Sequence, residues 1–288
     1  MIKKILVTGG AGFVGSHLCE RLAQDENNDV YSLDNYFTGS ENNHVKNVTY
    51  IRGSTVNIAE LVTFYPGMVY HLGEYSRVEQ SFDDIKKVWK YNKDGIFAVL
   101  EFVRKAGCKI LYAGSSTKFG DGGLGRSASP YAWTKASNTE LVQNYGSWFN
   151  VPYVITYFYN VYGSREIQTG KYATLIALFK EKMKNNEPLT IVSPGTQKRN
   201  FTHIEDIING LILVGENGFG DEFGIGSCES YTIKEIAQMY DGEIQMLPER
   251  AGNRMVADVV TAKTEALGWT PTKNVKDYIK NCRENDWK

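Results

Sequence analysis

The chain has 288 residues, enough for one large α/β domain or two smaller ones with a sizeable core. Its 32 Lys and Arg residues nearly balance its 33 Asp and Glu residues, and the net charge of −1 argues against broad electrostatic binding of nucleic acid or of an anionic membrane. Hydrophobic residues make up 42% and charged residues 23%, which excludes a disordered chain, and no apolar run approaches the roughly 18 residues of a membrane span.

Strand-like and helical patterns alternate through the first half of the chain. A helix follows the first strand, a long helix ends near Ala106, and another is predicted over Pro130–Phe149. The predicted strands are Lys4–Thr8, Asp29–Leu33, Val48–Arg52, Met68–Leu72, Lys109–Ala113 and Val151–Tyr157. This alternation implies parallel pairing, so we predict an α/β fold with a Rossmann-type doubly wound parallel sheet.

The pattern loosens after about Ser164, where strands and helices no longer alternate regularly. The predicted elements there are the helices Tyr172–Lys184, Ile204–Val214 and Thr232–Tyr240 and the strand Leu189–Val192. We therefore expect residues 165–288 to form a smaller C-terminal lobe, with a segment near 199–216 returning to the larger lobe.

The four cysteines are far apart in the sequence and form no CxxC pair. They are Cys19, Cys108, Cys228 and Cys282. The pattern indicates neither a zinc site nor a disulfide framework, and we expect buried thiols in a reducing cytoplasm. No other group of His, Cys, Asp and Glu has metal-ligand spacing, so no metal site is predicted.

A glycine-rich turn follows the first predicted strand. Gly9, Gly12 and Gly15 form a GxxGxxG pattern that opens a predicted helix. Glycine allows a tight turn and close approach of the backbone to a pyrophosphate, and the helix N-terminus supplies N–H groups. Such spacing also occurs in ordinary turns, but its place between strand and helix favours a dinucleotide site.

Asp34 ends the second predicted strand. A carboxylate there accepts hydrogen bonds from an adenosine ribose and repels a 2′-phosphate, which favours NAD over NADP. Asn35 follows, and no arginine stands beside it in the sequence to bind the extra phosphate. The alternative is a solvated loop aspartate.

Tyr131 and Lys135 lie one helical turn apart in the predicted helix Pro130–Phe149, so their side chains can share one face. A nearby cation favours phenolate over phenol and would let Tyr131 act as a general base closer to neutral pH. Such pairs are common on protein surfaces. Ser115 strengthens the functional interpretation because it follows the fifth strand, at the sheet edge where doubly wound folds bind ligands.

These motifs together resemble the extended short-chain dehydrogenase/reductase family, in its nucleotide-sugar epimerase/dehydratase group, which includes UDP-glucose 4-epimerases. The resemblance spans nearly the whole chain. The matching segments are Thr8–Gly15, Asp34–Asn35, His71–Leu72, Tyr131–Lys135, Asn160–Gly163, Arg199–Asp206 and Leu267–Trp269.

The resemblance implies that residues 1–164 bind NAD and that the smaller lobe binds the nucleotide part of a sugar substrate. It implies that Ser115 orients the sugar, that Tyr131 is the base, and that Lys135 tunes Tyr131 and contacts the nicotinamide ribose. The cofactor-binding residues it implies are Gly9, Gly12, Phe13, Val14, Gly15, Asp34, Asn35, Gly39, Ser54, Thr55, Leu72, Gly73, Tyr75, Asn92, Tyr131 and Lys135.

The same resemblance implies a substrate site formed by Ser115, Ser116, Thr117, Asn160, Arg199 and Arg250. Arginine offers a planar, permanently charged fork to phosphate oxygens, which suits the diphosphate. Dehydratases of the group carry an Asp-Glu pair directly after the catalytic hydroxyl residue, and decarboxylases keep the glutamate. Ser116 and Thr117 stand there instead, which favours an epimerase, acting at C4 through a keto-sugar.

Three alternatives remain open from the sequence. A dehydrogenase or reductase on the same scaffold would consume external cofactor, and a dehydratase would release water. A non-catalytic NAD-binding regulator would have no need of Ser115, Tyr131 and Lys135. Family members often dimerise through two helices, here around Tyr91–Ala106 and Tyr131–Phe149, so we expect a homodimer.

Five residues depart from the family pattern. Ser54 replaces an acidic residue that contacts adenine, and Tyr157 replaces a common arginine. Glu74 and Tyr75 replace small residues near the cofactor, and we interpret Glu74 as a loop charge. Lys118 replaces a small apolar residue and is expected beside the substrate pocket. His71 and His203 are interpreted as packing residues.

Overall fold

A computed structural model describes residues 2–119, 125–249 and 259–287. Its centre is a seven-stranded, wholly parallel sheet in the order β11-β6-β5-β4-β1-β2-β3. The strands are β1 (Lys3–Thr8), β2 (Asn28–Asp34), β3 (Val48–Arg52), β4 (Met68–His71), β5 (Lys109–Ala113), β6 (Tyr153–Phe158) and β11 (Gly220–Ile225). This topology confirms the predicted doubly wound parallel sheet.

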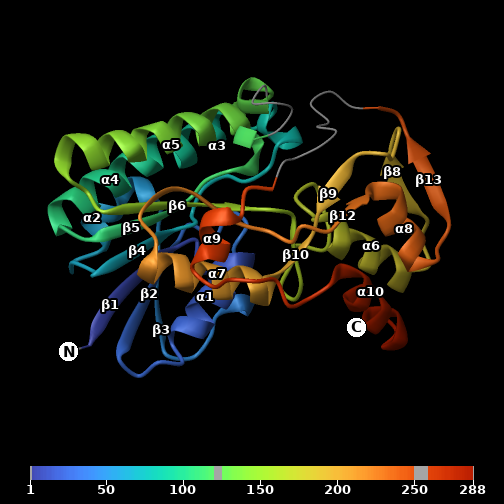
Figure 1. The fold of residues 1–288 in the computed structure, drawn as a ribbon, viewed down its shortest axis with the longest axis horizontal. Helices are drawn as coiled ribbons and strands as arrows, with labels where there is room; N and C mark the ends of the chain where they lie inside the picture. The colour runs from blue at the N-terminus through green and yellow to red at the C-terminus, as the bar shows by residue number, and fades with distance from the viewer. Residues whose placement is uncertain (1, 120–124, 250–258, 288) are drawn as a thin grey trace.

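Helices cover both faces of the sheet (Figure 1). On one face, α1 (Phe13–Leu22) and α7 (Ile204–Asn217) pack against the strands through one buried apolar cluster. On the other face lie α2 (Ile58–Leu61), α4 (Gly95–Ala106) and α5 (Pro130–Phe149), with α3 (Ile85–Val88) beside α5. Strands buried on both faces explain the near-continuous apolar runs that marked them in the sequence.

The helix α5 has the bounds that the sequence predicts. The Ser129 side chain accepts a hydrogen bond from Ala132 N at 3.1 Å, Pro130 occupies the first turn, and Asn150 ends the helix in the left-handed region with φ of 55°. Unusually for a buried helix face, α5 buries the polar residues Thr134, Lys135 and Asn138. Such residues are stable in a core only when they are hydrogen-bonded, so they indicate a polar network beneath the site.

The seventh strand, β11, is absent from the sequence-based prediction. Its sequence, GDEFGI, begins with polar residues and contains two glycines, so it lacks the pattern of a buried strand. It pairs with β6 because Phe223 and Ile225 join the apolar cluster beneath α7. The segment that returns to the larger lobe therefore extends to Ile225.

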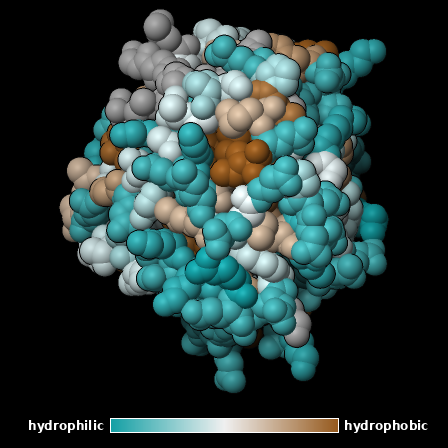
Figure 2. Space-filling view, turned by 90° about the vertical axis from the view of Figure 1, so that its right-hand side faces the viewer, coloured by the Kyte–Doolittle hydropathy of each residue, from teal (hydrophilic) through white to brown (hydrophobic). Residues whose placement is uncertain are grey.

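The smaller lobe has its own buried cluster, centred on Tyr162, Phe179 and Ile236. Its elements are β7 (Val161–Tyr162), α6 (Leu175–Lys184), β8 (Leu189–Val192), β9 (Lys198–Asn200), β10 (Thr202–His203), β12 (Ser230–Thr232), α8 (Ile233–Tyr240), β13 (Ile244–Leu247) and α10 (Val275–Glu284). The helix α9 (Ala262–Ala266) packs against β11 of the larger lobe instead. The outer face of the lobe is mostly hydrophilic, with a small hydrophobic area near its centre (Figure 2).

No helix among the described residues is both long and apolar enough to cross a membrane. All four cysteines are free, and three are buried as expected, but Cys228 is exposed. The expectation that every thiol is buried is therefore wrong for Cys228, which lies in the loop that precedes β12.

Candidate active site

A cavity of about 1120 Å³ lies at the carboxyl ends of the central strands and extends to the smaller lobe. Most of the site residues expected from the sequence line it. They are Gly9, Gly12, Phe13, Val14, Gly15, Asp34, Asn35, Thr55, Leu72, Gly73, Tyr75, Ser115, Ser116, Thr117, Tyr131, Lys135, Asn160 and Arg199. The topology brings these distant segments together because parallel strands end at one edge of the sheet.

Four expected residues are not in this lining. Arg250 lies outside the described residues. Gly39 packs against the Asp34 carboxylate, where an added Cβ would come within 3.0 Å of the carboxylate oxygens. Ser54 accepts a hydrogen bond from Val56 N, and buried Asn92 hydrogen-bonds the backbone N and O of Tyr75 at 2.7 and 3.2 Å. Gly39 and Asn92 therefore contact residues of the lining, whereas the hydrogen bond of Ser54 is local.

The glycine turn is closed to side chains. Gly9 has φ of +77°, and a Cβ on Gly15 would lie 2.1 Å from the Gly9 carbonyl oxygen. Gly12 precedes α1, and no side chain among the described residues caps the helix there. The first-turn N–H groups are therefore available to a phosphate, and the turn fits the pyrophosphate of a dinucleotide.

Asp34 ends β2 with its carboxylate facing the cavity. Its two oxygens accept hydrogen bonds from Ala11 N at 2.9 Å and Tyr36 N at 2.8 Å. Burial raises the pKa of Asp34, and these two backbone hydrogen bonds oppose the rise. Each oxygen keeps accepting capacity for a ribose hydroxyl, as the ribose-binding prediction requires.

An arginine that sequence adjacency did not reveal lies near Asp34. Arg52 is the partner of Asp34 in the register between β2 and β3. Its guanidinium stacks over the Tyr36 ring at 4.0 Å and pairs with Glu41. Predicting that β2 and β3 pair would have placed Arg52 next to Asp34, whereas inspection of the residues next to Asp34 in the sequence does not.

Three candidate catalytic side chains come from two elements. Tyr131 is in the first turn of α5 and Lys135 in the next, while Ser115 follows β5, and all three line the same cavity. The Ser115 hydroxyl accepts a hydrogen bond from Thr117 Oγ1 at 2.9 Å. The arrangement can therefore place a hydroxyl, a phenol and an ammonium around one ligand.

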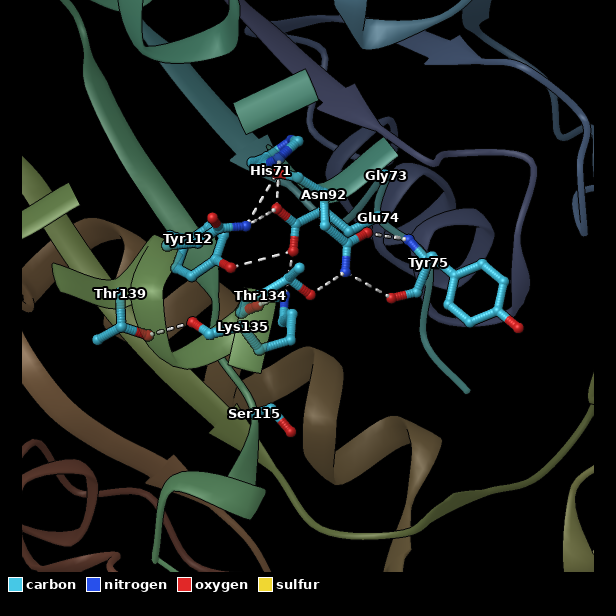
Figure 3. A network of polar contacts seen from close by, with 12 residues as sticks. His71, Gly73, Glu74, Tyr75, Asn92, Tyr112, Ser115, Thr134, Lys135 and Thr139 are labelled. Atoms are coloured by element: carbon cyan, nitrogen blue, oxygen red, sulfur yellow. Dashed lines mark hydrogen bonds and ion pairs between the residues drawn. The ribbon is translucent and has the colours of Figure 1, made fainter. Parts of the chain in front are cut away.

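Glu74 is a buried, paired carboxylate, so its interpretation as a loop charge is wrong. Its side chain is only 3% exposed and forms an ion pair with Lys135 (Figure 3). It also accepts hydrogen bonds from the Tyr112 hydroxyl at 3.0 Å and Asn138 Nδ2 at 3.1 Å. Burial acts to raise the pKa of Glu74, but the charge of Lys135 and the contact with His71 outweigh burial, so the pKa is lowered.

His71 is more than a packing residue. Its ring is fully buried, with Nδ1 2.7 Å from the Thr8 hydroxyl and Nε2 3.5 Å from Glu74 Oε1. His203, by contrast, packs against Tyr162 and accepts a hydrogen bond from Glu205 N at the start of α7. Both histidines therefore have polar roles, and no described group of His, Cys, Asp and Glu could hold a metal ion.

Two departures from the family pattern, Lys118 and Tyr157, form one structural cluster. Lys118 Nζ donates to Asp221 Oδ2 at 2.7 Å and to the Tyr157 hydroxyl at 3.2 Å, and that hydroxyl donates to Asp221 Oδ1 at 2.6 Å. Neither Lys118 nor Tyr157 is among the described residues that line the cavity. Lys118 therefore directs its ammonium group to Asp221 of β11, while the preceding residue, Thr117, lines the cavity.

The far end of the cavity is formed by both lobes. Asn160 donates to Asn200 O at 2.9 Å, and Arg199 lies on β9. Arg77, which the sequence did not single out, also lines the cavity and donates to the Tyr172 carbonyl from Nε at 2.9 Å and from Nη2 at 2.7 Å. Burial lowers the pKa of Arg77. Arg77 and Arg199 add positive charge to a cavity expected to take an anionic ligand.

Glu166 is a third buried acid in the lining, after Asp34 and Glu74. It accepts hydrogen bonds from Gly163 N at 2.8 Å and the Thr174 hydroxyl at 2.6 Å. Burial raises the pKa of Glu166 to about 7, and these hydrogen bonds only partly oppose the rise. The sequence offered no signal for it, because its burial depends on contacts with the second lobe.

The variant Glu166→Gln tests this assignment. Because the pKa of Glu166 is higher in the folded state than in the unfolded state, protonated Glu166 stabilises the fold at low pH. This stabilisation is lost as the pH rises through the folded-state pKa of about 7. Glutamine does not titrate, so the variant does not lose this stabilisation. From about pH 5 to about pH 8, the free energy of unfolding of the variant should rise on the order of 3 kcal/mol relative to that of wild type. Urea unfolding at both pH values measures the difference, and parallel pH dependences would contradict the assignment.

The fold and the cavity are those of an enzyme that binds a dinucleotide. Residues 5–226 match the NAD dependent epimerase/dehydratase family, and the chain belongs to this family. UDP-glucuronic acid decarboxylase 6 of Arabidopsis thaliana is 30% identical over 309 residues, covering 98% of this chain and 88% of the relative.

Two solved structures show the same fold over nearly the whole chain. UDP-glucose 4-epimerase of Thermotoga maritima with UDP-glucose superimposes with a TM-score of 0.90 at 25% identity, covering 96% of both chains. UDP-glucuronic acid 4-epimerase of Bacillus cereus in complex with UDP-glucuronic acid and NAD gives 0.88 at 27% identity, also covering 96% of both. NAD is the cofactor of the protein, and the glycine turn and Asp34 described above fit it.

Proposed function

We propose that the protein is an NAD-dependent nucleotide-sugar epimerase that inverts C4 of a nucleoside-diphosphate hexose. The supporting observation is that Ser115, Tyr131 and Lys135 face one cavity, while Ser116 and Thr117 beside them carry hydroxyls. In the family, dehydration relies on an Asp-Glu pair at those two positions, and decarboxylation relies on a glutamate at the second. Their absence favours a reaction in which only a hydroxyl proton and a hydride move.

Ser115, Tyr131 and Lys135 each have a separate role in the proposed reaction. Ser115 donates a hydrogen bond that orients the sugar hydroxyl, and Tyr131 removes its proton and later returns it. Lys135 holds positive charge beside Tyr131 and offers a donor to the ribose of the cofactor. NAD, when bound, would supply the hydride acceptor and donor, so an epimer would form with no net use of cofactor.

The nucleotide is proposed to lie toward the smaller lobe. Arg199 and Asn160 line that end of the cavity, and arginine suits the planar arrangement of phosphate oxygens. Arg250 is proposed as a third diphosphate contact on sequence grounds. The proposal divides the chain at about residue 164 into an NAD-binding part and a substrate-binding part, and a cytoplasmic location remains a prediction from the free thiols.

The proposed function is tested with a panel of UDP-, GDP-, CDP- and dTDP-sugars incubated with NAD-loaded protein. NMR should show new anomeric signals from an epimer, with no net formation of NADH. Accumulation of NADH would identify a dehydrogenase, and a stable keto-sugar formed with loss of water would identify a dehydratase. Lack of turnover of every sugar, with NAD bound, would favour the regulator.

We also propose a homodimer, formed through the helical face of α3, α4 and α5 at the top of Figure 1. This face exposes large apolar side chains that a monomer rarely leaves in water: Phe97 is 56% exposed, Trp89 48% and Trp133 41%. The Trp89 and Trp133 rings stack at 5.9 Å, which presents one continuous aromatic surface. Aromatic residues of this kind carry much of the binding energy in interfaces.

The variant Phe97→Glu should therefore separate the dimer. We expect the dissociation constant to rise by about 30-fold or more, because the charge would be buried at the centre of the interface. Light scattering over a concentration series measures it. Met246→Glu is the control, since Met246 is 46% exposed but lies on β13 of the smaller lobe, away from this face. Equal effects of both variants, or a monomeric wild type, would contradict the proposal.

A further inference from the structure

Glu74 is a carboxylate buried directly beneath the candidate catalytic lysine. It follows β4 and contacts residues of three other stretches of the chain (Figure 3). Oε2 accepts hydrogen bonds from Lys135 and Tyr112, while Oε1 accepts one from Asn138 and faces His71. A buried carboxylate is costly unless it is paired and hydrogen-bonded, and Glu74 is both.

The contacts of Lys135 define how Glu74 acts. The Lys135 ammonium has three N–H donors, and among the described residues it donates to Glu74 and to the carbonyl of Ala113. Its side chain is 6% exposed and lines the cavity beside Tyr131. Two donors therefore anchor the ammonium, and the third remains for a ligand in the cavity.

We propose that Glu74 is a positioning residue that fixes the ammonium of Lys135 and offsets its positive charge beside Tyr131. The proposal rests on the role proposed above for Tyr131 and Lys135. In this arrangement Tyr131 faces a nearly neutral pair instead of a lone cation. The stabilisation of the phenolate by Lys135 is correspondingly weaker, and removing the Glu74 charge restores it.

Other ionisable groups also interact with Glu74 or Tyr131 and contribute to the electrostatic environment of the Tyr131 hydroxyl. The buried hydroxyl of Tyr112 and the His71 ring contact Glu74 directly. Lys93 acts on Glu74 from the π-helical segment Trp89–Asp94, and Arg77 acts on Tyr131 across the cavity. These groups are unchanged in the variants described next, so a difference between variants reports on Glu74 and Lys135.

The test is an alkaline titration of the Tyr131 hydroxyl in NAD-loaded protein, with no sugar present. The near-ultraviolet phenolate signal is recorded for each variant and for the same variant carrying Tyr131→Phe, and the difference belongs to Tyr131. In Glu74→Gln we expect the midpoint to fall by about one pH unit. Glu140→Gln removes a charge from an exposed position on α5 and should move the midpoint by less than about 0.3 units.

A second variant keeps the test decisive if Glu74→Gln does not fold. The electroneutral pair Glu74→Gln with Lys135→Met should move the midpoint by less than about half a unit, because it removes both charges. A rise of about one unit or more in this double variant, or an unchanged midpoint in folded Glu74→Gln, overturns the proposal. The titration needs no turnover, so failure of the proposed epimerase reaction in the sugar panel is a separate result.

Discussion

Tyr131→Phe is expected to lower kcat for epimerisation by about three orders of magnitude while leaving the affinity for NAD nearly unchanged. The substitution removes only the hydroxyl that takes and returns the proton of the sugar. The ring stays in the first turn of α5, and the glycine turn and Asp34 are untouched. Turnover by NMR and cofactor binding by calorimetry measure the two effects.

Tyr65→Phe provides the matched control for this variant. It removes a hydroxyl from a tyrosine that is 67% exposed and is not among the residues lining the cavity. We expect kcat within about twofold of wild type. A Tyr131→Phe enzyme with near wild-type turnover would show that another group accepts the proton, and the proposed mechanism would be wrong.

Lys135→Met is expected to reduce the free energy of unfolding by about 3 kcal/mol at neutral pH. It leaves the Glu74 carboxylate buried without its cation, and breaking a buried ion pair on one side is much more costly than removing both charges. Adding Glu74→Gln to Lys135→Met should restore most of the loss. Urea unfolding of the four proteins in this cycle gives the coupling between the two residues.

The free energies of unfolding of wild type and of Lys135→Met should depend on pH in opposite ways with respect to Glu74. In wild type the folded-state pKa of Glu74 is lowered, so its stabilising contribution is present above the unfolded pKa and is lost as pH falls through the folded value. In Lys135→Met burial raises that pKa instead, so the deficit should shrink as pH falls and Glu74 takes up a proton. A deficit that is independent of pH, or one that Glu74→Gln does not reduce, would contradict the pairing.

Local signals explain which parts of the fold could be predicted from the sequence. The bounds of α5 follow from Ser129, Pro130 and a left-handed Asn150, all of which act within one turn of the chain. The strands β3, β5 and β8 are predicted at their observed bounds because short apolar runs mark them. By contrast, β11 is a strand only because β6 offers it a partner and α7 covers it, and β6 is far from β11 in the sequence.

In the candidate site, too, features set by local spacing could be predicted, and features set by long-range contacts could not. The glycine turn, Asp34 and the Tyr131–Lys135 pair depend on local spacing, and the structure brings them to one cavity. The role of Glu74 could not be predicted, because its partners come from β4, β5 and α5. The partner of Lys118 could not be predicted for a similar reason, since Asp221 is in a strand that the pattern did not reveal.

The path of the chain has a consequence for how this protein could be divided or recombined. Because β11 covers the outer edge of β6, a fragment that stops near residue 164 would expose that edge as a row of unpaired N–H and carbonyl groups. Such an edge invites intermolecular strand pairing and aggregation. A transplant of the smaller lobe between homologues would therefore need to leave α7 and β11 with the recipient, cutting the chain on both sides of them.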